Sequence, residues 1–181
     1  MSKEPATMLL QHHLKALKLP TFLRQYQSVA AVCAQERCGY PEYLFRLAER
    51  ELIDRERRAT ERRIKEARFA VQKTIETFDF SAQPSINESL VRELLRGEYL
   101  QKCENVLMVG NPGTGKTHLA TALGFAACTQ GKRVRFTSTT GLVTMLLEQR
   151  DNRTLQRLHK QLERLDLLIL DELGYVPFSK T

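Results

Sequence analysis

The sequence predicts an α/β protein, with a helical N-terminal region followed by a domain built on a parallel sheet of three strands. Three observations favour this fold class. Residues 1–103 combine apolar residues at helical spacing with dense charge. Residues 105–131 run from an apolar stretch through a glycine-rich loop into a stretch rich in Ala and Leu. Residues 167–170 form a continuous apolar run, typical of a strand buried on both faces.

In the N-terminal region, apolar spacing predicts helices over 8–18, 20–33 and 42–70. Residues 46–73 hold ten basic and six acidic side chains. Apolar positions are sparse in the middle of the third helix, so we expect its central turns to be solvated and supported by i,i+4 pairs such as Glu51–Arg55. A solvated charged face and an arm that contacts phosphates remain alternative interpretations, and the excess of Arg over Lys fits the second.

Capping and periodicity predict the remaining elements. Asn87 is a helix-capping residue type ahead of a helix that stops near Gly97. The later elements are a strand at 105–109, a loop at 110–117, a helix at 118–130, a strand at 134–137, helices around 142–147 and 155–165, and a strand at 167–170. We therefore divide the chain into a helical region with a long basic helix (1–76), a linker and helix (77–100), and a sheet domain (101–181).

The loop at 110–117 carries a phosphate-binding pattern. It matches G-x-x-x-x-G-K-[ST], the Walker A pattern, at every fixed position and lies between a predicted strand and a predicted helix. Gly113 and Gly115 let the backbone turn its N–H groups toward a phosphate at a helix N-terminus. Lys116 can place its ammonium against the β- and γ-phosphates, and the Thr117 hydroxyl can ligate Mg²⁺. The pattern predicts a nucleotide site.

The acidic pair Asp171-Glu172 follows the apolar run at 167–170. Ligands bind at the carboxyl ends of strands in open α/β sheets, so this pair is expected beside the phosphate loop. Asp171 would hold Mg²⁺ through water, and Glu172 would polarise a water for attack on the γ-phosphate. A carboxylate in that place favours hydrolysis over transfer to another acceptor, and no base-reading motif of a GTPase is present. The predicted reaction is ATP hydrolysis.

The net charge and the cysteine positions limit which partners and which metal sites the sequence favours. Lys and Arg number 28 and Asp and Glu 21, which gives a net charge of +7 and favours a polyanionic partner such as nucleic acid. The absence of Trp disfavours an aromatic platform for single strands. The four cysteines are scattered, which favours reduced thiols over a zinc site. With no apolar signal core and no long apolar run, we expect a cytoplasmic protein with no membrane partner.

The motifs together resemble a known family. GNPGTGKTHLA from Gly110 onward and LDLLILDELGYVPFSKT at 165–181 look like the IstB type of insertion-sequence helper ATPase. This group belongs to the AAA+ superfamily and is similar to the DnaC/DnaI helicase loaders. Phe78-Asp79-Phe80 ahead of the nucleotide domain also fits, and the resemblance covers essentially the whole chain. Leu173-Gly174-Tyr175 with Pro177-Phe178 favours the transposition helper over the loader.

The resemblance implies a function and a set of site residues. Family members bind ATP and Mg²⁺, assemble on double-stranded DNA as homo-oligomers with little sequence preference, and deliver target DNA to a partner transposase. Lys116 and Glu172 would be catalytic, and Thr117 and Asp171 would bind the metal. The nucleotide would contact Gly110, Asn111, Pro112, Gly113, Thr114, Gly115, Lys116, Thr117 and His118.

This sequence also differs from the family's pattern in one respect. The family's ATPase domain continues past residue 181 with two further strands, an inter-subunit arginine and a helical lid. The family's fourth strand lies between its first and third, so only the second and third strands keep their usual neighbour. Unpaired strand groups are costly, so we expect an incomplete AAA+ domain of low stability with weak or absent turnover. The alternatives are a helicase loader and a truncated remnant that binds nucleotide without turnover.

Overall fold

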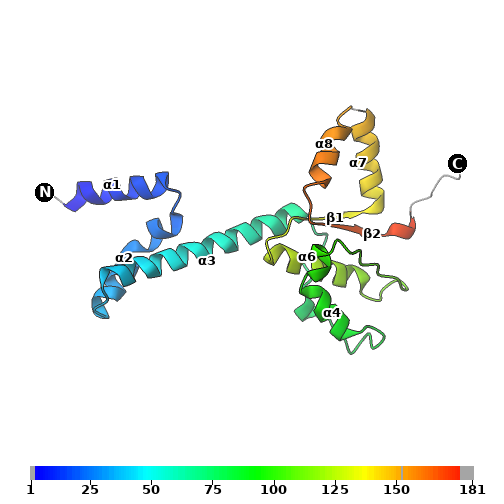
Figure 1. Cartoon of the computed structure of the whole chain (residues 1–181), viewed down its shortest axis with the longest axis horizontal. Coiled ribbons are helices and arrows are strands. Elements are labelled where there is room, and N and C mark those ends of the chain that lie inside the picture. The colour runs from blue at the N-terminus through cyan, green and yellow to red at the C-terminus, as the bar shows by residue number, and fades with distance from the viewer. Residues whose placement is uncertain (1–2, 152, 176–181) are drawn as a thin grey trace. The chain divides into compact units, whose positions relative to one another are not determined.

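The computed structural model describes residues 3–151 and 153–175. The chain divides into two compact units, Met1–Ala59 and Thr60–Thr181, with the division inside the long helix α3. Within the described residues, no helix has the length and apolar character that a membrane crossing requires. The elements in chain order are α1 (Lys3–Ala16), α2 (Pro20–Gln35), α3 (Tyr40–Ala67), the 3₁₀ turn η1 (Ile75–Thr77), α4 (Glu88–Leu95), α5 (Glu98–Gln101), α6 (Lys116–Thr129), β1 (Val134–Ser138), α7 (Thr139–Asp151), α8 (Leu155–Leu162), β2 (Leu167–Asp171) and the 3₁₀ turn η2 (Leu173–Tyr175) (Figure 1).

The first unit has a small core between α2 and the beginning of α3. Val29, Cys33 and Leu47 are buried there, and Tyr43 packs against them with its hydroxyl donating to the carbonyl oxygen of Tyr26 at 3.1 Å. The predicted helical character of this region is therefore confirmed, because apolar residues spaced three and four apart on two helices meet.

The middle of α3 departs from the expected solvated face. Glu51 is buried, with only 3% of its surface exposed. Its carboxylate accepts from the backbone N–H of Thr21 at 2.8 Å, from Arg58 at 3.2 Å and from Arg55 at 3.4 Å. The predicted Glu51–Arg55 pair is confirmed, but the prediction of solvation at this position is wrong, because α2 begins against it and supplies a backbone donor.

The second unit contains a two-stranded parallel sheet. Val134 pairs with Leu167 and Ser138 pairs with Asp171, so both strands end at the same edge. Along β1, Val134 and Phe136 turn into a core with α6, whereas Arg135 and Thr137 face a cavity lined by α7 and α8. Figure 1 shows α6 on one side of the sheet and α7 and α8 on the other. The α/β class and the pairing of these two strands are confirmed.

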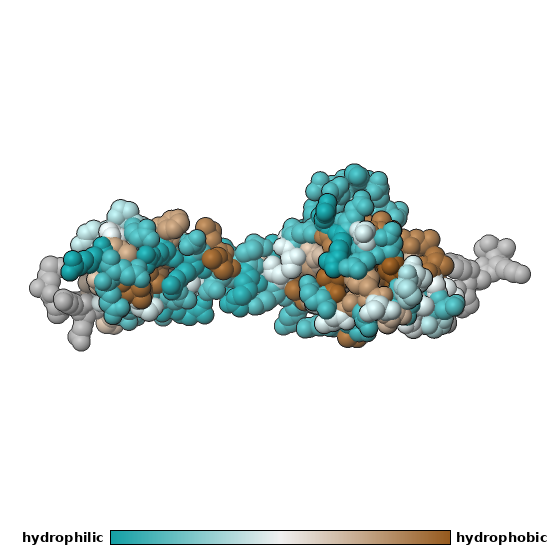
Figure 2. Space-filling view, turned by 90° about the horizontal axis from the view of Figure 1, so that it is seen from below, coloured by the Kyte–Doolittle hydropathy of each residue, from teal (hydrophilic) through white to brown (hydrophobic). Residues whose placement is uncertain are grey.

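The strand predicted at 105–109 is absent from the described residues. Residues 105–109 have no strand assignment, and Leu107 and Val109 are 76% and 86% exposed. The prediction of a three-stranded sheet is therefore wrong for this structure. Apolar character alone does not make a strand, because the backbone groups need a neighbouring strand to pair with, and β1 and β2 pair with each other. Figure 2 shows hydrophobic residues at the surface of each unit.

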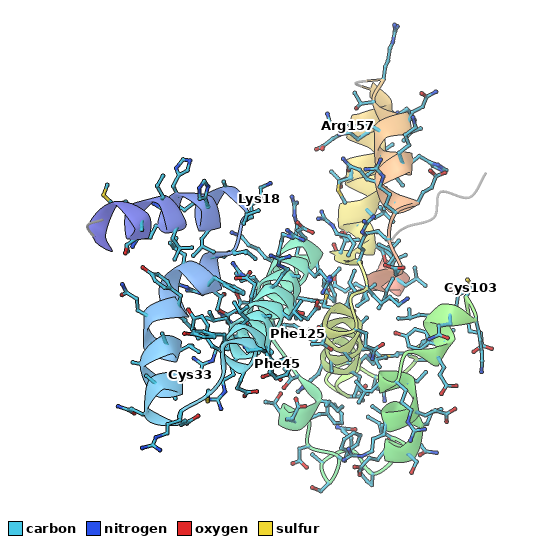
Figure 3. All side chains as sticks on the ribbon, turned by 60° about the vertical axis from the view of Figure 1, so that its left-hand side comes forward. Lys18, Cys33, Phe45, Cys103, Phe125 and Arg157 are labelled. Atoms are coloured by element: carbon cyan, nitrogen blue, oxygen red, sulfur yellow. The ribbon has the colours of Figure 1, made fainter. Side chains whose placement is uncertain are left out.

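Close packing fixes α6 on the sheet. A Cβ at Gly124 would lie 2.6 Å from Cε1 of Phe69 and 2.8 Å from Cδ1 of Ile169, so glycine allows the helix to approach both residues. Phe69 also stacks on Phe125, labelled on α6 in Figure 3, at 4.7 Å between ring centroids. These contacts pack the second half of α6 closely against Phe69 and β2.

Candidate functional site

The predicted phosphate loop lies between residue 109 and the first turn of α6, which begins at Lys116. Gly113 and Gly115 have φ angles of 80° and 85°, in the left-handed region that glycine adopts without strain. Inside the loop, Thr114 Oγ1 donates to the carbonyl oxygen of Asn111 at 2.9 Å. Pro112 is exposed beside them. The loop has the tight turn that the sequence pattern requires.

Lys116 holds the loop closed on itself. Its Nζ donates to the carbonyl oxygen of Gly110 at 2.9 Å and to that of Asn111 at 2.7 Å. The ammonium therefore lies over the loop, where the free N–H groups of a helix N-terminus also point. A cation and helix-terminal donors in one place can bind an anionic group such as a phosphate.

The acid at the end of β2 meets the start of α6. Thr117 Oγ1 donates to Asp171 Oδ2 at 2.9 Å, although the two residues lie 54 positions apart. The buried Thr139, at the start of α7, donates its hydroxyl to the carbonyl oxygen of Asp171 at 2.9 Å and fixes the end of the strand. The structure thus brings Lys116, Thr117 and Asp171 to one edge of the sheet.

Glu172 follows in an unusual backbone conformation. Its φ is 59°, and its backbone N–H donates to Asp171 Oδ1 at 3.0 Å. A non-glycine residue in the left-handed region costs free energy, and such residues are enriched at functional sites. The side chain is exposed, and no hydrogen bond among the described residues joins its carboxylate to the phosphate loop. The left-handed backbone at Glu172 ends the extended course of β2.

His118 is engaged with the segment that precedes α4. Its Nε2 lies 2.9 Å from the carbonyl oxygen of Thr74 and 3.2 Å from Oγ1 of Thr77. Its ring meets Phe78 edge to face at 5.0 Å. The structure therefore directs this imidazole toward residues 74–78, and its assignment as a nucleotide contact stays a prediction.

Phe78 was missed as a site residue by sequence reasoning. A Cβ placed on Gly115 would lie 2.7 Å from Cε2 of Phe78, so the ring lies directly against the phosphate loop. Its signal was present in the motif Phe78-Asp79-Phe80, which has two aromatic residues in an otherwise polar link. Thr139 gave a weaker signal, as a helix-starting residue type directly after a strand.

Comparison with known proteins gives a consistent picture. Residues 12–181 match the family model described as IstB-like ATP binding protein. The chain is similar to the ATP-binding protein of insertion sequence IS21 from Pseudomonas aeruginosa (38% identical, covering 92% of this chain and 63% of the relative). It is also similar to that of IS5376 from Geobacillus stearothermophilus (34% identical, 92% and 66%). The chain thus spans about two thirds of the length of these relatives.

Proposed function

The chain belongs to the family of IstB-like ATP binding proteins, and from that premise we propose that it binds ATP with Mg²⁺ and hydrolyses it while acting on DNA as a transposition helper. The observation that carries the proposal is the contact of 2.9 Å between Thr117 and Asp171, which joins the two predicted halves of a nucleotide site. A chance glycine-rich turn would have no reason to lie against a strand-terminal carboxylate.

Lys116 is the proposed phosphate ligand. Its ammonium donates to the carbonyl oxygens of Gly110 and Asn111, and the β- and γ-phosphate oxygens of ATP would replace these acceptors. Backbone N–H groups of residues 110–118, other than Pro112, which has none, would complete the cradle, with Gly113 and Gly115 supplying the curvature. The same ammonium would stabilise the charge that develops on the γ-phosphate during hydrolysis, which gives Lys116 a catalytic role as well.

The oxygen donors at Thr117 and Asp171 fit Mg²⁺. A hydroxyl and a carboxylate are the hard ligands that this ion prefers, and it usually takes few protein ligands and completes its shell with phosphates and water. Consistent with that mode, residues 3–151 and 153–175 hold no group of three or more His, Cys, Asp or Glu side chains suited to a metal ion. Bound Mg²⁺ would neutralise charge on the β- and γ-phosphates.

Glu172 is the proposed general base. It follows the proposed metal acid directly, its backbone is in the left-handed region just after β2, and its side chain is exposed. A carboxylate there would accept a proton from the water that attacks the γ-phosphate. The products would be ADP and phosphate, with the proton held on Glu172 and then released.

The wider role follows from the relatives and from the charge. The relatives are named as proteins of insertion sequences, and the net charge of +7 suits a polyanion. We propose double-stranded DNA bound with little sequence preference, a transposase as partner, homo-oligomeric assembly and a cytoplasmic location. We also propose the functional division into 1–76, 77–100 and 101–181. The contact of Phe78 with Gly115 supports a linker that communicates with the nucleotide site.

The test is ATP binding and hydrolysis by matched variants. Lys116→Ala is expected to weaken ATP binding about ten- to hundredfold, because charge-assisted hydrogen bonds contribute about 1.5–3 kcal/mol. Glu172→Gln should bind ATP normally and lose turnover, and Asp171→Asn should lose the dependence of binding on Mg²⁺. Arg96→Gln is the control, since this exposed residue caps α4 outside the site. Calorimetry measures ATP binding, and phosphate release measures turnover.

The outcomes separate the proposal from its alternatives. Unchanged ATP binding by Lys116→Ala would exclude the assignment of this loop as the nucleotide site. Binding without turnover by the wild type, with and without DNA, would instead favour a protein that binds nucleotide only. Stimulation of the transposase of the element, compared with stimulation of a replicative helicase, distinguishes the transposition helper from a loader.

A further inference from the structure

The second unit has a cavity of about 410 Å³ on the side of the sheet opposite α6. Its floor is apolar, formed by Leu142 and Met145 of α7, Leu158 of α8 and Leu168 of β2. Arg135 of β1 projects into it, because alternate residues of a strand face opposite sides of the sheet. The cavity is distinct from the phosphate loop, which lies where the strands end.

Five arginines line this cavity, against one carboxylate, Glu66. The arginines come from three separate parts of the sequence, namely the end of α3 with the residue after it, β1 with the residue before it, and the segment after α8. They are Arg63, Arg68, Arg133, Arg135 and Arg164. Glu66 itself is exposed and lies 4.0 Å from Arg62 outside the cavity. The cavity therefore carries a concentrated positive charge.

Most of these guanidinium groups have no acidic partner. Among the residues the structure describes, no ion pair involves Arg68, Arg133, Arg135 or Arg164. Burial lowers the pKa of Arg135, and the nearby charge of Arg68 lowers it further. Two like charges held near one another are unfavourable, and an anion bound between them would relieve the repulsion.

The arginines in the first unit behave differently. Arg55 and Arg58 bind the buried Glu51, and Arg57 lies 3.5 Å from Asp54. These ion pairs neutralise their charge where α2 packs against α3. The basic side chains of this part of α3 are therefore already paired within the first unit.

We propose that this cavity binds a phosphate group, and that the group belongs to the backbone of a DNA strand. Guanidinium groups are suited to phosphate because they donate two parallel hydrogen bonds. The apolar floor is suited to the sugar, which carries little charge, and a contact of this kind reads no base sequence. The inference rests on the proposed DNA binding and assigns to it a site separate from the nucleotide site.

The experiment compares DNA binding by the whole chain and three variants. Arg135→Gln and Arg68→Gln each remove one charge from the cavity. Arg96→Gln removes one charge from an exposed position on the same unit that has no ion pair among the described residues. Fluorescence anisotropy with two duplexes of unrelated sequence, at several salt concentrations, gives the affinity and its salt dependence. ATP binding by each variant reports an intact fold.

The expected result is about tenfold weaker binding of both duplexes by each cavity variant, with the salt slope reduced by about one. Arg96→Gln should stay within about twofold of the wild type. Cavity variants that bind DNA as the wild type does would overturn the inference and leave DNA binding itself standing.

If the wild type binds no DNA, the DNA part of the proposed function fails. Titration with inorganic phosphate then decides whether the cavity binds an anion. Phosphate binding lost in Arg135→Gln would support the anion site with a phosphate from another source. Equal phosphate binding by both proteins would overturn the site.

Discussion

Gly115 offers the sharpest test of how the phosphate loop is held, because two separate costs of adding a methyl group can be measured there. The first is conformational. At a φ of 85°, alanine is strained by about 1–2 kcal/mol. The second is steric, since the new Cβ would lie 2.7 Å from Cε2 and 3.2 Å from Cζ of Phe78. Overpacking of this kind costs about 1–3 kcal/mol. Gly115→Ala should therefore destabilise the protein by about 2–5 kcal/mol.

Gly113→Ala is the matched control. Its φ is 80°, but no atom lies within 4 Å of the added Cβ. It should carry the conformational cost alone, about 1–2 kcal/mol. The excess cost at Gly115 is then assigned to Phe78.

Urea unfolding followed by circular dichroism measures both costs through the shift of the midpoint. In a Phe78→Ala background, the cost of Gly115→Ala should fall to that of Gly113→Ala, which gives a coupling free energy of about 1–3 kcal/mol. An equal cost of Gly115→Ala with and without the Phe78 ring would refute the reasoning. It would mean that the segment before α4 does not rest on the phosphate loop in solution.

Two further predictions concern stability. Burial opposes ionisation of Glu51, but hydrogen bonds from the backbone of Thr21 and Phe22 and from Arg58 outweigh it and lower its pKa. The stability that Glu51 contributes is therefore fully present above the unfolded pKa of about 4.3 and is lost as pH falls through the lower folded value. Glu51→Gln should be less stable than the wild type at pH 7, and urea unfolding at a series of pH values should show a smaller loss of stability below pH 4.3. An unchanged pH profile would contradict this. Gly124→Ala should cost about 1–3 kcal/mol despite its better helix propensity, because its Cβ would collide with Phe69 and Ile169, and a raised thermal midpoint would show that α6 has room to move.

The parts of the site that the sequence predicted well are those fixed by local chemistry and chain direction. The glycines at 113 and 115 signal left-handed backbone, and both adopt it. The run at 167–170 signals a strand, and β2 covers it and ends at Asp171, but the prediction of burial on both faces is wrong, because only Ile169 is buried and Leu170 is 39% exposed. Because parallel strands end at a common edge, the loop and the acid could be placed together before their contact was observed.

The parts that it missed depend on neighbours far away in the chain. Residues 105–109 have the composition of a strand, yet they are exposed, because pairing requires a partner that composition cannot supply. The sequence pattern predicts that Glu51 is exposed, and its burial follows from the position at which α2 starts. The arginine cavity gathers residues from three segments, none of which is exceptional by itself. Periodicity reports the face of one element and not what packs on it.

The hydrogen bonds at the proposed nucleotide site also bear on how ATP binding would be regulated. Lys116 and Thr117 are both satisfied within the protein, through the carbonyl oxygens of Gly110 and Asn111 and through Asp171. A nucleotide bound as proposed would replace these bonds, each worth about 0.5–1.5 kcal/mol net. The affinity is therefore a difference between two sets of contacts. Anything that shifts Asp171, including the hold of Thr139 on the end of β2, changes that difference without touching the nucleotide. The segment at 74–78 can act on the same balance from the other side, through His118 and Gly115.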